Sequence, residues 1–494
     1  MIPEALRQKS GSGGFPGFTL TRDSLLAQPS ALRVLQGVIL AVLTLILIPV
    51  LSGGSSLIIL SAPVAGIGAF WLLRNPHWGV LGILTLMIAE IKGLFGASYL
   101  LSAILLISLA VAIIRDRGCW LLRVPQVQIL LVIGFVFFIS TGWSEFKFPI
   151  TLDLGKDQTV RQAREFVTHL IWLVFFIYFI NTRKRIEFTA ALAVGLVLAA
   201  ALSACITFVA TGGAHRAEAS FGLAQNSNRL AYICVFGMSL VWFYRSYGSS
   251  RAWKLLCLPL LFFFPVVALT AGSRSGLLQL VMLGALILKD QRGWSPAKRI
   301  SCVFFIGVVA VLIIALVPAG YLDRVTTFDP EVDAPGQQSL QTRTAVVFSA
   351  LKMFASDPFF GVGIGNFNWV APAFLGTSGV THNSYLWALT SGGIGVLALY
   401  LLLFYVTYRM LSRLEKSGPR ELLWLSKATK ANLLLFLIFS GFADFWLSDF
   451  IYLIIGLAIA MTYLWRRGER KVAANPPRAD LSPEMRLPSL AGAR

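Results

Sequence analysis

The sequence predicts an all-α polytopic integral membrane protein of about 12 to 14 transmembrane helices, with one long outer loop that contains short amphipathic helices. Composition is the first reason, because 56% of the 494 residues are hydrophobic and only 13% are charged. The mean hydropathy of +0.75 also lies outside the range of soluble domains. The apolar segments are too long for barrel strands, and lipid leaves no other partner for the backbone, so the spans must be helices.

Segments long enough to cross a bilayer recur along the chain. The segment 78–94 is the weakest of them, because the charged residues Glu90 and Lys92 interrupt it. About fourteen spans are expected from segment lengths of about 17 to 25 residues: 34–52, 55–73, 78–94, 98–114, 126–142, 166–181, 188–211, 229–244, 254–271, 275–289, 300–319, 383–408, 431–447 and 449–465.

The distribution of basic residues predicts the orientation of these spans. The chain has 42 Lys and Arg against 23 Asp and Glu, a net charge of +19. With a cytoplasmic N-terminus, most of the basic residues, including Arg183-Lys184-Arg185 and Arg466-Arg467, fall on the cytoplasmic side, as positive residues usually do. The basic charge therefore indicates topology and attraction to anionic lipid, and nucleic acid is not an expected partner.

Three regions follow from this topology. Residues 1–33 form a disordered cytoplasmic tail without the apolar core of a signal peptide, and residues 466–494 form a basic cytoplasmic tail. Residues 34–465 form the transmembrane domain, which includes the long outer loop 320–382. The five cysteines are scattered and form no C-x-x-C pair, so neither a disulfide framework nor a thiolate metal site is expected.

Two shorter outer segments differ in their charges. The charges of 143–165 nearly cancel, which favours a solvated loop. The segment 212–228 leads into a helix that begins at Asn228 or Arg229, where the amide of Asn228 can cap it. Arg216 and Arg229 stand at the outer mouth against the topological bias, and a guanidinium suits bidentate binding of phosphate. Arg229 could instead extend toward the lipid headgroups.

The turn Ala271-Gly272-Ser273-Arg274-Ser275-Gly276 also lies on the outer face. A turn requires Gly and Ser but no Arg. The charge of Arg274 opposes the dipole of the helix that begins there, whereas a bound anion would be favoured by the dipole and by the free N–H groups. We therefore expect Arg274 to bind an anion; contact with lipid headgroups is the alternative.

The long outer loop is expected to contain a helix that begins at Ser339 or Gln341 and ends at Asp357-Pro358. One apolar face of this helix would lie on the membrane or dock on the bundle; it comprises Ala345, Val346, Phe348, Ala350, Leu351 and Phe354. The glycines of 361–365 lack the strand and helix of a dinucleotide-binding unit, so they are expected to permit close backbone packing.

His382 ends this loop, beside the aromatic residues Tyr385 and Trp387. Tyr and Trp are typical of the membrane interface, so a structural histidine is one interpretation. The predicted outer face also holds Arg216, Arg274 and Arg343, and no second histidine or carboxylate cluster has the spacing of metal ligands. One imidazole among guanidiniums indicates proton transfer beside a bound anion, with no metal site.

Four short motifs together resemble the bacterial O-antigen ligase and polysaccharide polymerase superfamily, over about residues 212–400. They are Thr381-His382-Asn383-Ser384-Tyr385-Leu386 with Ser391-Gly392-Gly393-Ile394-Gly395, Arg343 with the segment 357–367, Gly272-Ser273-Arg274-Ser275-Gly276, and Arg216 with Phe221-Gly222 and Asn228-Arg229-Leu230-Ala231. The chain departs from the family pattern in its larger number of spans, and in carrying Gln225 or Ser227 where Pro often precedes the Asn.

The resemblance implies a metal-independent membrane glycosyltransferase of the inner membrane whose active site faces the periplasm and which needs no cofactor. The donor would be a glycan on a polyprenyl diphosphate, such as undecaprenyl diphosphate, and the acceptor a second glycan, with polysaccharide assembly proteins as further partners. Arg216 and Arg274 would bind the diphosphate, with Arg343, Arg229 and Asn228 as additional substrate-binding residues. His382 would accept the proton of the acceptor hydroxyl, and Asn383 would orient the imidazole or cap the helix.

Three functions remain open on the sequence. Span number is more variable among polymerases, which favours the polymerisation of repeat units of a surface or exported polysaccharide. The close alternative is an O-antigen ligase that transfers the glycan to lipid A core or to protein. A flippase of lipid-linked oligosaccharides has a similar number of helices, but it should carry polar groups near the middle of its spans. Here such charges are nearly absent apart from Glu90 and Lys92.

Overall fold

The computed structural model describes residues 68–89, 95–116, 120–147, 156–211, 217–219, 226–297, 299–301, 303–304, 307, 311, 334–375, 381–443 and 448–474. The chain divides into two compact units, Met1–Asn75 and Pro76–Arg494. In the first unit the described residues 68–74 are helical. The expected tail 1–33, the span 34–52 and nearly all of the spans 55–73 and 300–319 lie outside the described residues, as do Glu90, Lys92 and residues 475–494.

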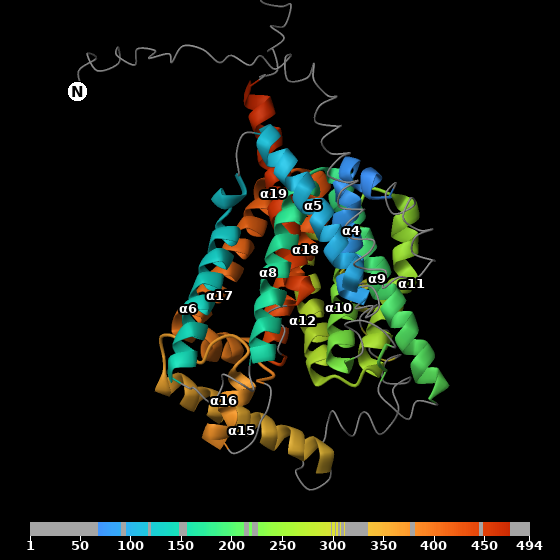
Figure 1. Cartoon of the computed structure of the whole chain (residues 1–494). Helices are drawn as coiled ribbons and strands as arrows, with labels where there is room; N and C mark the ends of the chain where they lie inside the picture. The colour runs from blue at the N-terminus through green and yellow to red at the C-terminus, as the bar shows by residue number, and fades with distance from the viewer. Residues whose placement is uncertain are drawn as a thin grey trace, which may run out of the picture. The chain divides into compact units, whose positions relative to one another are not determined.

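The second unit consists of helices, and its described residues contain no strand, which confirms the all-α class (Figure 1). The α-helices are α4 (Pro76–Ala89), α5 (Phe95–Asp116), α6 (Pro125–Lys147), α8 (Lys156–Phe179), α9 (Arg183–Ala210), α10 (Ser227–Tyr247), α11 (Arg251–Thr270), α12 (Arg274–Asp290), α15 (Ala334–Ser356), α16 (Phe367–Leu375), α17 (Ser384–Ser417), α18 (Leu423–Ser440) and α19 (Asp449–Ala474).

Six helical segments among the described residues are long and apolar enough to cross a membrane. They are Pro125–Lys147, Arg183–Ala210, Arg251–Thr270, Ser384–Ser417, Arg420–Ser440 and Asp449–Gly468. The observed boundaries differ from the expected ones, for example where α17 ends at Ser417 and not at residue 408. The helix expected over 431–447 begins at Leu423 and ends at Ser440, and α19 continues beyond residue 465 to Ala474.

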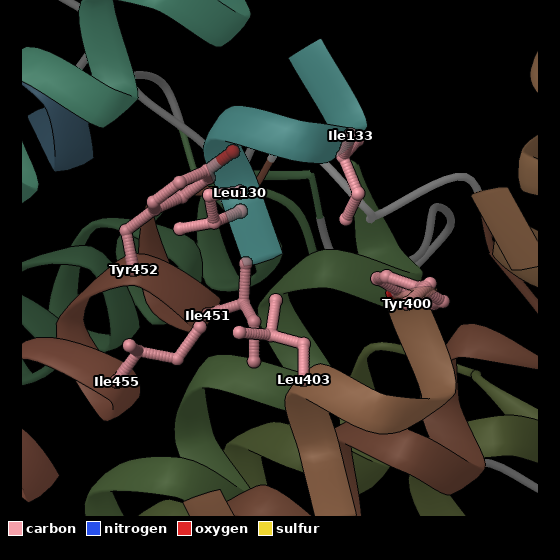
Figure 2. A pocket seen from close by; sticks show the side chains of 7 residues that line it. All are labelled: Leu130, Ile133, Tyr400, Leu403, Ile451, Tyr452 and Ile455. Carbon is pink, nitrogen blue, oxygen red and sulfur yellow. The ribbon is translucent and has the colours of Figure 1, made fainter. Parts of the chain in front are cut away.

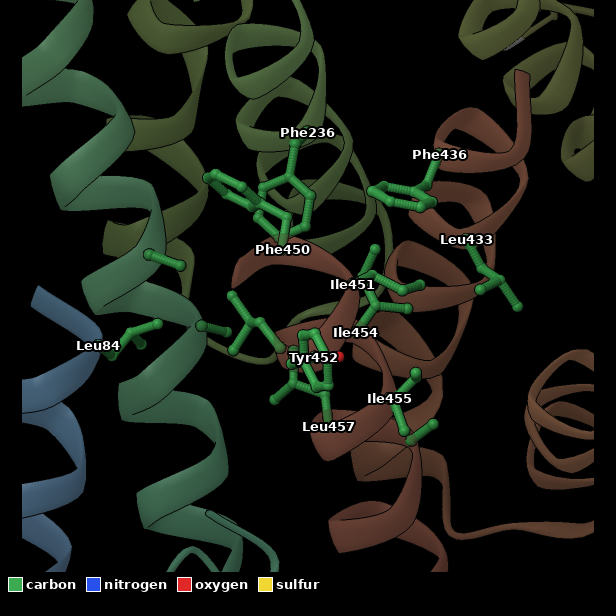
Figure 3. Packing of buried hydrophobic residues seen from close by; sticks show 14 of the residues in the cluster. Leu84, Phe236, Leu433, Phe436, Phe450, Ile451, Tyr452, Ile454, Ile455 and Leu457 are labelled. Atoms are coloured by element: carbon green, nitrogen blue, oxygen red, sulfur yellow. The ribbon is translucent and has the colours of Figure 1, made fainter. Parts of the chain in front are cut away.

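The core of the bundle is built around α10, which is buried along nearly all of its length and packs against α9, α11, α12 and α18. Its Tyr232 stacks on Phe439 of α18, with ring centroids 4.8 Å apart, and meets Phe450 of α19 edge-on at 5.7 Å. Figure 3 shows the neighbouring Phe236, Phe436 and Phe450 in this cluster. In lipid, close packing of this kind holds helices together, because lipid tails are as apolar as the side chains.

Charged groups lock the end of the bundle where α10 and α12 terminate. Asp290, the last residue of α12, accepts hydrogen bonds from the Tyr247 hydroxyl at 2.5 Å and from Lys427 of α18. Lys430 of α18 pairs in the same way with Glu415 of α17. Each charge in these pairs has an opposite charge beside it, so no charge of the pairs is buried without a partner. The contacts connect α10, α12, α17 and α18.

Helix α17 is broken near its start. Gly392 and Gly393 leave the helical conformation, with φ of −149° and +68°. The positive φ at Gly393 is a conformation that glycine adopts without a steric cost. The break separates a short first part, which follows His382, from the long part that runs to Ser417.

The loop segment that contains the predicted glycine-rich motif fills this break. The Ile394 N–H donates to Pro358 O at 2.9 Å, and the Val362 N–H donates to Thr390 O at 2.7 Å. A Cβ on Gly361 would lie 2.2 Å from Thr390 O. The expectation that these glycines permit close backbone packing is thus confirmed, and two separate sequence motifs satisfy each other's backbone groups.

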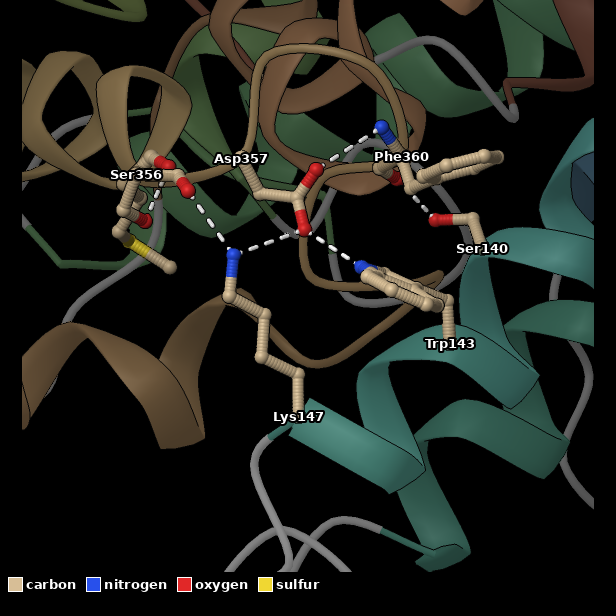
Figure 4. A network of polar contacts seen from close by, with 7 residues as sticks. Ser140, Trp143, Lys147, Ser356, Asp357 and Phe360 are labelled. Atoms are coloured by element: carbon tan, nitrogen blue, oxygen red, sulfur yellow. Dashed lines mark hydrogen bonds and ion pairs between the residues drawn. The ribbon is translucent and has the colours of Figure 1, made fainter.

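Asp357 holds the start of this loop segment against α6 (Figure 4). Its Oδ2 accepts from the Trp143 indole N–H at 2.6 Å and from Lys147 Nζ at 3.0 Å. Burial alone would raise the pKa of Asp357, but the hydrogen bonds from Lys147, Trp143 and the Phe360 N–H outweigh burial, so its pKa lies below the usual value. The carboxylate is therefore ionised throughout the neutral range.

The interpretation of 143–165 as a solvated loop was wrong. Residues up to Lys147 continue α6, and residues from Lys156 onward belong to α8. Both helix ends contact the loop segment, since the Thr159 hydroxyl of α8 donates to Asn366 Oδ1 at 2.6 Å and Asn366 Nδ2 donates to Ser144 Oγ of α6 at 3.3 Å. The sequence interpretation rested on the near-balance of charge in this segment, which gives no information about the partners of single side chains.

Helices α15 and α16 lie across one end of the bundle, below α6 and α17 in Figure 1. Helix α15 begins at Ala334, earlier than the expected Ser339 or Gln341, and ends before Asp357 as expected. Its Val346, Ala350 and Met353 pack on α16, so this part of the predicted apolar face docks on protein. Phe348 and Leu351 are instead exposed, because they occupy another side of the helix.

Alanine at Gly393 should destabilise the protein by roughly 2 to 4 kcal/mol, because the new side chain combines backbone strain with a clash. A Cβ at this position would lie 2.3 Å from Phe359 O, a backbone atom that cannot swing away. Thermal unfolding of the purified protein in detergent measures the effect. Gly395→Ala is the matched control, since a Cβ there meets nothing within 4 Å; equal unfolding temperatures for the two variants would contradict the prediction.

Candidate functional site

His382 lies two residues before Ser384, the first residue of α17. It is exposed and has a φ of +47°, which is uncommon for a residue with a side chain. Its neighbours Thr381 and Ser384 are buried and fix the backbone on both sides. Conformations of this kind persist where the surroundings enforce them, and they concentrate at functional sites.

Asn383 caps α17 and joins it to the end of α18. Its Oδ1 accepts from the N–H groups of Tyr385 and Leu386 at 2.9 and 3.1 Å, and its Nδ2 donates to Gly441 O at 3.1 Å. Ser384 adds a bond from its hydroxyl to Ala443 O at 2.7 Å. Asn383 thus has the capping role considered for it, and it also fixes the backbone that carries the imidazole.

Arg274 is the first residue of α12 and is exposed. Ser273, buried before it, caps the helix by accepting from the Gly276 N–H at 3.1 Å. Gly272 has a φ of +67°, so the turn needs this glycine. The exposed guanidinium stands where an anion would meet the helix N-terminus.

Asn228 and Arg229 lie in the first turn of α10, and both are half-buried. The expectation that Asn228 caps the helix was wrong. The cap is Asn226, whose Oδ1 accepts from the N–H groups of Asn228 and Arg229 at 2.9 and 3.4 Å. The side chain of Asn228 is therefore not used as a cap, because a residue two positions earlier fulfils that function.

Arg216 lies outside the described residues. The residue after it, Ala217, is fully buried, and its N–H donates to Thr270 O at 3.1 Å. Thr270 is the last residue of α11, directly before the turn that carries Arg274. The described part of this segment is thus attached to the Arg274 turn.

A continuous series of contacts connects these residues at one end of the bundle. From His382, Asn383 bonds to Gly441, which follows α18, and Phe439 in the last turns of α18 stacks on Tyr232 of α10. Ala231, next to Tyr232, lies so close to α12 that a Cβ on Gly276 would be 2.5 Å from its own Cβ. The series therefore runs from the residue after His382 to the first turns of α10 and α12, the turns that carry Arg229 and Arg274.

Arg343 is not part of this series. It is exposed on α15, which packs on α16 and α17. Within the described part of the chain, no hydrogen bond or ion pair joins Arg343 to the other predicted site residues. The structure thus brings together His382, Asn383, Asn228, Arg229 and Arg274 and leaves Arg343 on the neighbouring helix.

A buried pair that the sequence interpretation missed lies at the same end. His169 of α8 faces Asp449, the first residue of α19, with Nε2 and Oδ1 2.5 Å apart. Phe450, beside Asp449, contacts Tyr232, so the pair adjoins the series of contacts. Two sequence features could have revealed the pair: a histidine inside one apolar segment and an aspartate at the start of another. Ionisable groups are uncommon in membrane-spanning segments.

The geometry suits an anion with a proton acceptor nearby. Helices α10, α12 and α17 all begin at this end, and their positive dipole ends add to the charges of Arg229 and Arg274. Among the residues described, no three His, Cys, Asp or Glu side chains gather in a way that could hold a metal ion. The imidazole is the exposed group of this constellation that can take up a proton near neutral pH.

Comparison with known proteins agrees with the motifs. No curated protein matches the chain. The O-antigen ligase family matches residues 259–401, a range that includes the Arg274 turn, the loop segment at the α17 break and His382, but not the start of α10. Residues 259–401 of the chain thus match an O-antigen ligase domain, which supports the resemblance to the O-antigen ligase superfamily.

Proposed function

We propose that this protein is a glycosyltransferase that polymerises the polyprenyl-diphosphate-linked repeat units of a surface or exported polysaccharide at the periplasmic face of the inner membrane. The observation that carries the proposal is the packing, at one end of the bundle, of the helix starts that carry His382, Arg229 and Arg274. The match to the O-antigen ligase family supports the reaction class and a lipid-linked glycan donor.

The arginines would hold the donor. A diphosphate carries the charge that two guanidiniums and helix N-termini bind well. Arg274 and Arg216 are assigned to the diphosphate, with Arg229 and Asn228 beside them, and Arg343 to the glycan that extends over α15. Because negative charge increases on the diphosphate as it leaves, the arginines stabilise the transition state more than the bound donor.

His382 would activate the acceptor. Its imidazole takes the proton from the acceptor hydroxyl while the hydroxyl oxygen attacks the anomeric carbon of the donor sugar. The new C–O bond forms as the bond from that carbon to the diphosphate breaks, and its electron pair leaves with the polyprenyl diphosphate. Attack from the face opposite the leaving group inverts the anomeric centre. In this scheme the arginines, and not a metal ion, stabilise the charge of the leaving diphosphate.

Purified protein with a defined polyprenyl-diphosphate glycan should form longer lipid-linked glycans, and chelator should leave the rate unchanged. Gel analysis of glycan length measures the product. Transfer only to lipid A core or to protein, without chain extension, would replace the polymerase by a ligase. A strict requirement for a divalent cation would overturn the metal-independent scheme.

His382→Ala should lower turnover about 100- to 10,000-fold, because general base catalysis contributes a factor of this order. Donor binding should persist, since the arginines remain. His77→Ala is the control. His77, in the first turn of α4, lies near Arg185 in the first turn of α9, away from the end where the site residues gather. Turnover of His382→Ala within threefold of the control would remove His382 as the base.

Arg274→Ala should reduce kcat/KM about 100-fold or more, since a charge-assisted contact to the leaving diphosphate is lost. Arg274→Lys should recover only part of the rate, because an ammonium cannot bind two phosphate oxygens in the guanidinium geometry. The matched control is Arg251→Ala, an exposed arginine that likewise begins a helix. Similar rates for the two alanine variants would exclude Arg274 from donor binding.

A further inference from the structure

The buried His169 and Asp449 have no part in the reaction described above, although ionisable groups inside a membrane bundle are costly and are kept for a purpose. The exposed fraction of each side chain is 11%. His169 Nδ1 lies 2.6 Å from the carbonyl oxygen of Glu165, in the preceding turn of α8. The imidazole ring stacks on Tyr452 of α19, with ring centroids 4.9 Å apart.

The partners determine where the protons are. A carbonyl oxygen only accepts, so Nδ1 carries a proton and donates it to Glu165. The 2.5 Å contact between Nε2 and Asp449 Oδ1 requires one more proton between these atoms. Whether that proton resides on the imidazole or on the carboxyl group, the pair as a whole is uncharged, which makes it compatible with its buried place.

The pair fixes the beginning of α19. Asp449 is its first residue, and Tyr452 lies one turn later, so His169 holds this turn by a hydrogen bond and by stacking. Tyr452 also lines a small apolar pocket between α6, α17 and α19 (Figure 2). The first turn of α19 is therefore attached to α8 on one side and packed toward α6 and α17 on the other.

This turn is connected to His382 through rings that are all buried. Phe450 follows Asp449 and packs on Tyr232 at 5.7 Å, and Tyr232 stacks on Phe439 at 4.8 Å. Phe439 precedes Gly441, whose carbonyl oxygen receives the Asn383 amide. A shift of the α19 turn would move Phe450, Tyr232 and Phe439, and with them the acceptor that holds the residue after His382.

We propose that His169 and Asp449 are positioning residues for His382, which set the orientation of its imidazole through Tyr232 and the end of α18. The proposal rests on the proposed function for its catalytic consequence, but its structural statement can be tested without any turnover. Exchange of Asp449 for Asn retains the shape of the side chain and replaces the carboxyl group by an amide that cannot share this proton, so the variant can fold while the pairing with His169 changes.

The first test is activity-independent. The chain has four histidines, and their imidazole signals can be resolved by NMR of the full-length, histidine-labelled protein in nanodiscs, with His382→Ala for assignment. Asp449→Asn should move the signals of both His169 and His382. Thr462→Val is the control on the same helix, because Thr462 bonds only within α19, to Ala458 O. A shift of His169 alone would overturn the proposal, even if the protein proved not to be a glycosyltransferase.

The second test uses transfer rates. Asp449→Asn and His169→Gln should lower kcat about 10- to 100-fold, the size expected from misplacing a catalytic group, and should change KM for the lipid-linked donor by less than twofold. In a His382→Ala background the same substitutions should cause no further loss, because they act through that imidazole. Additive losses, or a change confined to KM, would assign the pair to packing or donor binding and reject the positioning role.

Discussion

The break in α17 is the constraint on which the arrangement of the site depends. A helix interrupted at Gly392 and Gly393 leaves backbone groups of Thr390 and Ile394 without their usual partners, and the loop segment 358–362 supplies them. In an apolar surrounding, unpaired backbone groups are expensive, so the break and the loop segment stabilise each other. Ser140 of α6 reinforces the junction by donating to Ser391 O at 2.7 Å.

The same junction explains why the site lies at a helix bundle's end and not within it. Asp357 and Asn366 bind the loop segment to α6 and α8. The residue that caps α17, Asn383, is hydrogen-bonded to the end of α18. Helix starts with positive dipole ends then face one region, together with Arg229 and Arg274. Under the proposed function, these fixed backbone groups would attract an anion without rearrangement, which is a favourable condition for stabilising charge that develops during a reaction.

Much of the fold could be predicted from the sequence, because lipid restricts the chain to helices and apolar length reveals them. The start of α17 after Asn383 and the end of α15 before Asp357 followed from capping and proline rules. The sequence indicated a candidate site residue where a side chain conflicted with its local role, as Arg274 does at a helix start, and the role of Arg274 stays a prediction. The position of Arg216 stays a prediction, since it lies outside the described residues.

Long-range partners could not be predicted in this way. Lys147 appeared as one charge in a balanced loop, although it pairs with Asp357, which is 210 residues away. His169 and Asp449 are 280 residues apart, and neither has a local pattern that announces the other. The error at Asn228 has a smaller cause: two asparagines stand within one turn, and the backbone alone decides which of them is the cap.

The break at Gly392 and Gly393 divides α17 into two parts with different surroundings. The long part from Ile394 to Ser417 supplies most of the segment Ser384–Ser417, which is long and apolar enough to cross a membrane, and the tilt of such a helix depends on bilayer thickness. The short part that follows His382 is attached to α18 by Asn383 and Ser384. Because the break is held by the loop segment, the direction of the short part is set by its bonds to α18 and not by the direction in which the long part continues toward Ser417.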